Sequence, residues 1–181
     1  SNLPRRAVLM VSKPMVPPFN DSAKNLVREI VGAVPGVAFH LMSTAGAPPV
    51  AGAVLEPVYG DAGRYSPALR QNLRVLRRLL TPDDLGLYHF FFAPNLKTSL
   101  MARLVLAAKR RLSVHTVCSA PRTFEGVSRL LFADRTVAVS RATRDALVAA
   151  GVPGVVHIPP AVPDATPVSD AAVARLRARL G

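Results

Sequence analysis

Cysteine, tryptophan and acidic residues are scarce in this chain of 181 residues. It contains one cysteine, Cys118, and no tryptophan. A single cysteine excludes a disulfide within the chain, which agrees with a reducing compartment. No apolar run reaches the roughly 20 residues that a membrane-spanning helix needs, and no secretory signal is visible. We therefore expect a cytoplasmic protein.

Acidic side chains are outnumbered, with 11 Asp and Glu against 23 Lys and Arg and a formal net charge of +12. This excess favours an anionic partner: nucleotide phosphate, an anionic membrane at whose inner face the protein would be peripheral, or nucleic acid. Few aromatic residues and the lack of a recognition motif argue against nucleic acid. Many arginines also lie opposite apolar stripes, where a solvated helix face explains them without any partner.

Motifs for metals and for common cofactors are missing as well. His, Cys, Asp and Glu nowhere have the spacing of metal ligands, so we expect no metal site. Neither a P-loop nor a G-x-G-x-x-G pattern follows the first strand, and no Ser-His-Asp arrangement can be picked out. The chain therefore carries no self-evident catalytic signature.

The sequence does contain apolar segments in which strand patterns alternate with helix patterns. Half of the residues are hydrophobic, which is enough for a packed core. Residues 7–11 have the pattern of a buried strand, and after a proline-rich loop come Asn20, Asp21 and Ser22, residue types that cap a helix start. A core-facing stripe at helical spacing then follows at Leu26, Val27, Ile30 and Val31.

The alternation continues to the end of the chain. Further strands are predicted at 37–42, 53–58, 87–93, 113–118, 136–139 and 155–158, and further helices at 66–80, 96–109, 141–150 and 168–180. The run at 87–93 fits a central strand that is buried on both faces, with His89 as a core histidine. In the helix at 66–80 one face is predicted to carry Leu69, Leu73, Leu76 and Leu80, and the other Arg70, Arg74, Arg77 and Arg78.

This order predicts an α/β fold: a Rossmann-like, doubly wound and mainly parallel sheet with helices on both faces. Ligands of such folds bind outside the carboxyl ends of the strands, where helix N-termini point at them. We expect residues 1–4 to be a disordered remnant of a purification tag and residues 5–162 to form the domain. Residues 163–181 are expected to be a linker and the start of a truncated second domain.

Several segments resemble glycosyltransferases of family 4 (glycosyl transferase group 1). The resemblance is carried by residues 137–140 (VAVS), a helix that ends in 149–152 (AAGV), and 156–162 (VHIPPAV), where Ala161 stands in place of the usual glycine. Residues 8–30 are similar to the first strand, loop and helix of the family, and 87–95 (LYHFFFAPN) to its fourth strand. Together these segments cover most of residues 6–162.

The resemblance implies the N-terminal, acceptor-binding domain of an enzyme with the GT-B architecture. Such an enzyme would be retaining and independent of metal, and would move a sugar from a nucleotide-sugar to a hydroxyl of a glycan, lipid or small molecule. It would need no cofactor, and the missing C-terminal domain would hold most of the donor. We expect this fragment alone to be inactive.

One departure from the family concerns its "TxH" pattern at the end of the fifth strand. Here Thr116 and Val117 are followed by Cys118 in place of the histidine, and the nearest histidine is His115. Side chains alternate along a strand, so His115 and Cys118 are predicted to face opposite sides of the sheet. The catalytic residue is therefore unknown, with Cys118 as its only candidate; the alternative is a small buried residue.

The substrate-binding candidates are Lys13, Asn20, Asp21, Ser22, Lys24, Asn95, Ser140 and Arg141. The two lysines could reach a diphosphate or an acidic acceptor. Ser140 is first of all a helix cap, whereas Arg141 lies in a first helical turn, against the helix dipole. His40 and His157 are predicted to be structural. The alternative function is a non-enzymatic Rossmann-like module that binds an anionic ligand or a partner through its basic surface.

Overall fold

Strands and helices alternate along the chain in the predicted order. The computed structural model describes residues 6–60, 69–160 and 169–180. The strands are β1 (Arg6–Val11), β2 (Val37–Thr44), β3 (Ala53–Tyr59), β4 (Leu87–Phe91), β5 (Leu112–Val117), β6 (Arg135–Ala138) and β7 (Val155–His157). The helices are α1 (Ser22–Ala33), α2 (Leu69–Leu80), α3 (Leu96–Lys109), the short 3-10 helix η1 (Val127–Arg129), α4 (Arg141–Ala149) and α5 (Asp170–Leu180).

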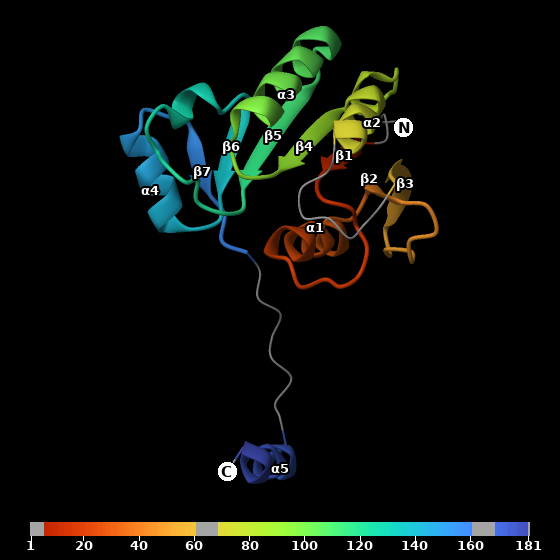
Figure 1. Ribbon diagram of the computed structural model, residues 1–181, viewed down its shortest axis with the longest axis vertical. Coiled ribbons are helices and arrows are strands. Elements are labelled where there is room, and N and C mark those ends of the chain that lie inside the picture. The colour runs from red at the N-terminus through yellow and green to blue at the C-terminus, as the bar shows by residue number, and fades with distance from the viewer. Residues whose placement is uncertain (1–5, 61–68, 161–168, 181) are drawn as a thin grey trace.

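All seven strands form one sheet in the order β3-β2-β1-β4-β5-β6-β7. Every neighbouring pair is parallel, which confirms the Rossmann-like, doubly wound fold (Figure 1). The chain runs outward from β1 through β2 to β3, then returns across the sheet to place β4 on the other side of β1. The strand order therefore reverses between β1 and β4, the point at which such sheets bind ligands.

The central strand β4 is buried on both faces, as predicted. Tyr88 and Phe90 point into a core formed with α2 and α3, whereas Phe91 points into a core formed with α1. A ring nitrogen of His89 lies 2.7 Å from the hydroxyl of Thr116, so this histidine is a satisfied core residue. A third core joins α4 and η1 to the strands β5 to β7.

The apolar face predicted for α2 is wrong at Leu73 and Leu80, whereas Leu76 packs against the core and Arg70, Arg74 and Arg77 are exposed, as predicted. The helix buries Val75 and Leu79, whereas Leu73 is 55% exposed and Leu80 is 48% exposed. Apolar residues recur at helical spacing on two flanks of this helix, and the sequence pattern alone does not show which flank faces the core. The position of the sheet decides which flank is covered, because a helix buries whatever faces its neighbours.

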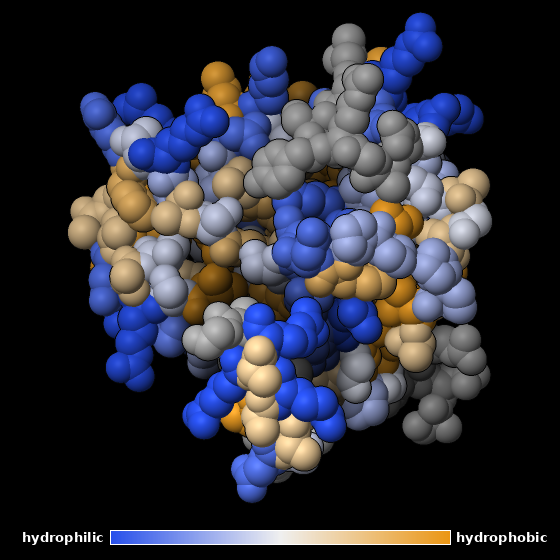
Figure 2. Space-filling model, turned by 60° about the horizontal axis from the view of Figure 1, so that its bottom comes forward, coloured by the Kyte–Doolittle hydropathy of each residue, from blue (hydrophilic) through white to orange (hydrophobic). Residues whose placement is uncertain are grey.

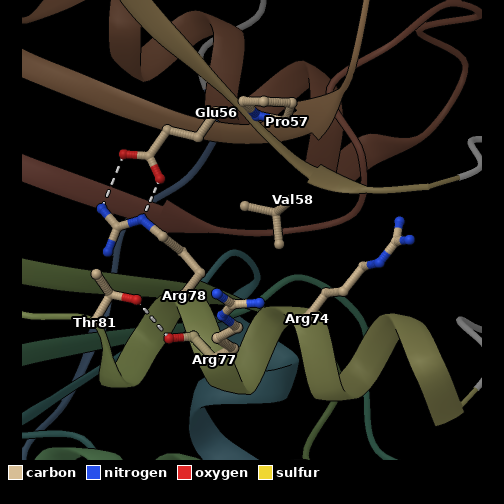
Figure 3. A pocket seen from close by; sticks show the side chains of 7 residues that line it. All are labelled: Glu56, Pro57, Val58, Arg74, Arg77, Arg78 and Thr81. Atoms are coloured by element: carbon tan, nitrogen blue, oxygen red, sulfur yellow. Dashed lines mark hydrogen bonds and ion pairs between the residues drawn. The ribbon is translucent and has the colours of Figure 1, made fainter.

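A network of ion pairs fixes α2 against the edge strand β3. The guanidinium of Arg78 donates both Nε and Nη2 to Glu56, the latter at 2.9 Å, and Nη1 to Asp83 at 2.8 Å. Figure 3 shows the pair between Glu56 and Arg78 beside Arg74 and Arg77. Lys109 at the end of α3 also donates to Asp83 and to the Tyr88 hydroxyl. The network thus joins β3, α2, α3 and β4.

The structure tests only part of the predicted domain division. Helix α5 confirms the helix predicted at 168–180, except for its first residues. Residues 1–5 and 161–168, which contain the predicted tag remnant and the predicted linker, lie outside the described residues, as do 66–68 at the predicted start of α2. The division at residue 162 stays a prediction.

Replacing Arg78 by alanine should lower the free energy of unfolding by about 2 kcal/mol, because it leaves the partly buried carboxylates of Glu56 and Asp83 without their main partner. Arg77→Ala is the matched control: it is exposed on the same helix and should change stability by less than about 0.5 kcal/mol. Urea unfolding of both variants measures the difference. Equal stability of the two variants would show that the network does not support the fold.

Candidate functional site

A cavity of about 570 Å³ lies at the point where the strand order reverses. Its walls come from the segments that follow β1, β4 and β5, from the end of β3, and from the first turns of α1 and α3, with α2 closing one side. Figure 2 looks onto this end of the molecule, where hydrophobic atoms line a hollow among hydrophilic side chains. Strands and helices distant in sequence thus contribute to one site.

The loop between β1 and α1 is held in place by side chains from the strands β2 and β3. The Tyr59 hydroxyl donates to the Ser12 carbonyl at 2.6 Å, and the Ser43 hydroxyl donates to the Met15 carbonyl at 3.0 Å. Burial raises the pKa of Tyr59, so its phenol stays protonated and able to donate. Each bond satisfies a buried carbonyl, which keeps the loop in one conformation.

Asp21 caps α1 and pairs with Lys13 at the wall of the cavity. Its Oδ1 accepts from the backbone N–H groups of Ala23 at 2.9 Å and Lys24 at 3.3 Å, and its Oδ2 accepts from the Lys13 ammonium. Burial alone would raise the pKa of Asp21, but Lys13 and the two N–H groups outweigh it and hold the pKa below its usual value. Asp21 is therefore a carboxylate at neutral pH.

The opposite wall begins at Asn95, the N-cap of α3. Its side-chain oxygen accepts from the Thr98 N–H at 3.1 Å, and its amide donates to the Ala93 carbonyl at 3.2 Å. The N-termini of α1 and α3 both meet the cavity, and each carries the partial positive charge of its helix. Lys97 adds a full charge beside Asn95. The cavity is thus suited to a polar or anionic ligand.

Five of the predicted site residues line this cavity, namely Lys13, Asp21, Ser22, Asn95 and Cys118. The other four do not: Asn20 and Arg141 are exposed outside it. Lys24 is buried, and its ammonium donates to the Val16 carbonyl at 2.8 Å. Ser140 caps α4 by accepting from the Thr143 N–H at 3.1 Å. That these four residues contact a substrate stays a prediction.

Sequence reasoning missed the residues that reach the cavity from other elements: Tyr59, Gln71, Asn72, Phe92, Lys97 and Ser119. Tyr59 and Phe92 carried a usable signal, because they lie at or just past the ends of predicted strands, and the carboxyl ends of parallel strands meet at one edge. Gln71 and Asn72 carried none, since only the packing of α2 brings them there.

Cys118 and His115 face opposite sides of the sheet, as predicted. Cys118 packs with the α1 core, whereas His115 stacks on Phe132 and contacts the tilted ring of Phe92 in the interior. Burial raises the pKa of the Cys118 thiol to about 12, so the thiol is neutral at pH 7. It can offer a small, weakly polar surface to a ligand, but no thiolate nucleophile.

Acidic residues and histidines are scarce in the described lining of the cavity. Among its described lining residues the only carboxylate is Asp21, which is engaged with Lys13, and none is a histidine. In the described part of the chain no group of three or more His, Cys, Asp and Glu could hold a metal ion. No described helix is long and apolar enough to cross a membrane.

A second hollow, of about 470 Å³, lies between β3 and α2. It is lined by Glu56, Arg74, Arg77 and Arg78, among others, and Figure 3 shows the three arginines on α2 and Glu56 on the strand opposite. The Glu56 carboxylate and the Arg78 guanidinium bind each other. We assign this hollow a structural role.

Comparison with known proteins supports the fold. Ten chains of solved structures match, among them the crystal structure of Anabaena Alr3699/HepE in complex with UDP-glucose, with a TM-score of 0.58 and 15% sequence identity. The match covers 96% of this chain and 49% of HepE, so this chain spans about half the length of that protein. No protein-family profile and no curated protein sequence matches. The chain therefore shares a Rossmann-like α/β fold with half of a protein that was crystallised with a nucleotide-sugar.

Replacing Asp21 by alanine should lower the free energy of unfolding by about 1–2 kcal/mol, because it removes the cap of α1 and the partner of Lys13. Ser22→Ala is the matched control: Ser22 is the next residue along and is exposed at the first helical position, and its replacement should cost less than about 0.5 kcal/mol. Urea unfolding compares the two. A larger loss for Ser22→Ala would contradict the assigned cap.

The two buried histidines should make stability depend on pH. Burial lowers the pKa of His115 to about 4 and that of His89 to about 3. Because the unfolded chain binds protons near pH 6.5 and the folded chain does not, stability is complete above pH 6.5 and falls as the pH drops toward 4. His115→Phe should flatten this fall by about 1 kcal/mol per pH unit. Urea unfolding at pH 7.5, 6 and 5 measures it, and equal slopes in both proteins would refute it.

Proposed function

We propose that this chain is the acceptor-side domain of a retaining glycosyltransferase with the GT-B architecture, of the family 4 type. The enzyme would transfer a sugar from a nucleotide-sugar to a hydroxyl of a glycan, lipid or small molecule. The observation that carries the proposal is the cavity at the β1/β4 reversal, in a fold that HepE shares over 96% of this chain. The HepE structure contains UDP-glucose, which supports a nucleotide-sugar as the donor here.

The composition of the cavity supports an acceptor role. Phe91, Val75 and Met101 provide apolar surface beside the polar groups of Lys13 and Asn95. Sugar rings and lipid-linked sugars present both kinds of surface, whereas the described lining has no free acid or base pair for chemistry. The proposed enzyme therefore needs a second domain, which fits the 49% of HepE that this chain spans.

Positive charge at the cavity has a role in the proposed reaction. The leaving nucleoside diphosphate gains negative charge as its bond to the sugar breaks, and fixed positive groups stabilise it. Lys13 and the N-terminus of α1 are placed for this, with Asp21 holding the lysine in position. No metal is required in this scheme, because cationic side chains and helix ends supply the stabilisation.

The decisive experiment uses the full-length product of the gene that encodes this chain. Nucleotide-sugars are titrated into it by calorimetry, and sugar transfer to candidate acceptors is then followed, together with the anomeric configuration of the product. We expect one donor to bind, transfer with retention, and no transfer by residues 1–181 alone. No binding of any donor would overturn the proposal and favour the non-enzymatic module.

Replacing Lys13 by methionine should reduce kcat/KM for sugar transfer about tenfold or more, a loss of at least ~1.4 kcal/mol of transition-state stabilisation. The charge is removed while the length of the side chain is kept, and Lys13→Arg should restore part of the activity. Arg135→Met, an exposed residue at the start of β6 far along the strand from the cavity edge, is the matched control with unchanged kinetics. Full activity of Lys13→Met would remove Lys13 from the site.

A further inference from the structure

Helix α3 is apolar on its outer face as well as on its inner face. Ala102 and Val105 are fully buried toward the sheet. On the opposite side Leu96, Leu100 and Leu104 follow one another at four-residue spacing and form one stripe. Their exposed fractions are 71%, 56% and 63%. An ordinary solvated helix carries charged residues on this outer face, so the leucine stripe calls for an explanation.

Helix α2 extends the same apolar surface. It lies beside α3 in Figure 1 and contacts it. Arg78 binds Glu56 of β3 and so marks the flank of α2 that faces the sheet edge. Residues 73 and 80 lie on the opposite helical flank, the one toward α3. The exposed leucines of α2, Leu73 and Leu80, therefore border the leucine stripe of α3.

The leucine stripe lies on the side of α3 that is turned toward α2, as the hydrogen bonds of Arg103 show. Arg103 donates to the carbonyls of Arg129 and Leu131, at 2.9 Å in the case of Leu131, so its flank of α3 faces η1. Leu100 and Leu104 lie between that flank and the flank toward α2. The five exposed leucines thus form one surface, which we call the leucine surface: Leu73, Leu80, Leu96, Leu100 and Leu104.

The charged residues within the two helices that carry the leucine surface are all of one sign. Helices α2 and α3 contain no Asp or Glu. Arg70 and Arg77 are exposed on the outer flank of α2, and Lys97 is exposed near the start of α3. Arg74 instead reaches Gly60 after β3. Acidic residues are thus absent from two neighbouring surface helices, which departs from the mixture of signs that is usual for a soluble surface.

We propose that the leucine surface and its rim of basic residues dock the protein onto an anionic lipid membrane. Exposed leucines on one face with Lys and Arg beside them are the features by which amphipathic helices lie in a bilayer interface. The basic side chains meet lipid phosphates while the leucines enter the boundary of the acyl chains. None of the five leucines lines the cavity. Docking through the leucine surface would therefore bring the cavity near the membrane without changing its lining.

Charge complementarity favours an anionic lipid surface over a second copy of this chain as the partner of the leucine surface. A second copy of this chain would bring a cationic rim against an identical cationic rim, and like charges at an interface oppose each other. A contiguous exposed apolar patch marks an interaction site, and a partner with negative charge spread over a wide surface is complementary to this one. Anionic lipid meets both conditions.

Vesicle sedimentation tests the proposal with the full chain. The probes are vesicles of phosphatidylcholine with 40% phosphatidylglycerol and vesicles of phosphatidylcholine alone, at 0.1 M and 0.5 M NaCl. We expect binding to the anionic vesicles, at least tenfold weaker binding to the neutral ones, and weakening but not loss at high salt, because the leucines contribute without charge. No preference for anionic vesicles would overturn the proposal.

Two pairs of variants locate the binding surface. Leu100→Glu with Leu104→Glu, and separately Arg70→Glu with Arg77→Glu, should each weaken anionic-vesicle binding at least tenfold. Val148→Glu on α4, where valine is 52% exposed, and Arg135→Glu are the matched controls and should bind like the parent. Circular dichroism and urea unfolding check that each variant is folded. Equal losses in the controls would show a general charge effect and refute the surface.

Sedimentation equilibrium of the protein without vesicles tests whether a second copy of this chain covers the leucine surface instead of lipid. A dimer that Leu100→Glu dissociates, together with absent vesicle binding, would assign the leucine surface to self-association and overturn the lipid proposal. A monomer that binds anionic vesicles through this surface supports it. The outcome does not depend on sugar transfer, so it stands or falls separately from the proposed enzyme activity.

Discussion

The candidate site depends on how the backbone between β1 and α1 is held. Three buried carbonyl groups of this loop accept hydrogen bonds from side chains of three different elements: Tyr59 of β3, Ser43 of β2 and Lys24 of α1. A buried carbonyl without a donor costs several kcal/mol in an apolar environment, so the loop conformation is specified by elements that lie far apart in the sequence. Lys13, Asp21 and the start of α1 take their places at the cavity because the loop cannot move away.

The buried Lys24 illustrates how the same residue type serves two purposes in this site. Its ammonium lies beside the loop it supports, and burial lowers its pKa below the usual value, with Lys13 adding to this and Asp21 opposing it. Lys13, which directly follows Ser12, is instead at the cavity wall and pairs with Asp21. One lysine fixes the backbone and the other lies at the cavity wall beside Asp21, although both have the same side chain.

The cavity and the proposed docking surface lie on different parts of the domain. The cavity lies at the carboxyl edge, where loops and helix ends meet, whereas the leucine surface lies on the outer flanks of α2 and α3. The ion pair of Arg78 with Glu56 links α2 to β3, and the ion pairs of Arg78 and Lys109 with Asp83, which also accepts from Tyr88 of β4, link both helices to β4. The packing that orients the leucine surface is therefore part of the packing that closes the cavity, since Val75 and Met101 of the same helices line it.

Local residue patterns determined the order of the elements and much of their ends. The cap of α1 at Asp21, the cap of α3 at Asn95 and the cap of α4 at Ser140 can each be identified from residue type and position, because a cap needs only a short side chain beside the first helical N–H groups. The central position of β4 follows from its uninterrupted apolar run. The opposite facing of His115 and Cys118 follows from the alternation of strand side chains.

Only the tertiary structure decided which groups meet. Leu73 and Leu80 of α2 recur at core spacing and yet face solvent, because the sheet lies under the flank with Val75 and Leu79. Asn72 and Lys97 reach the cavity because α2 and α3 pack beside the β1/β4 reversal. A helix or strand pattern states which residues share a face, but contact with another element requires the long-range pairing of strands, which local sequence does not encode. The sequence therefore determined the elements, and the packing of the sheet determined the site.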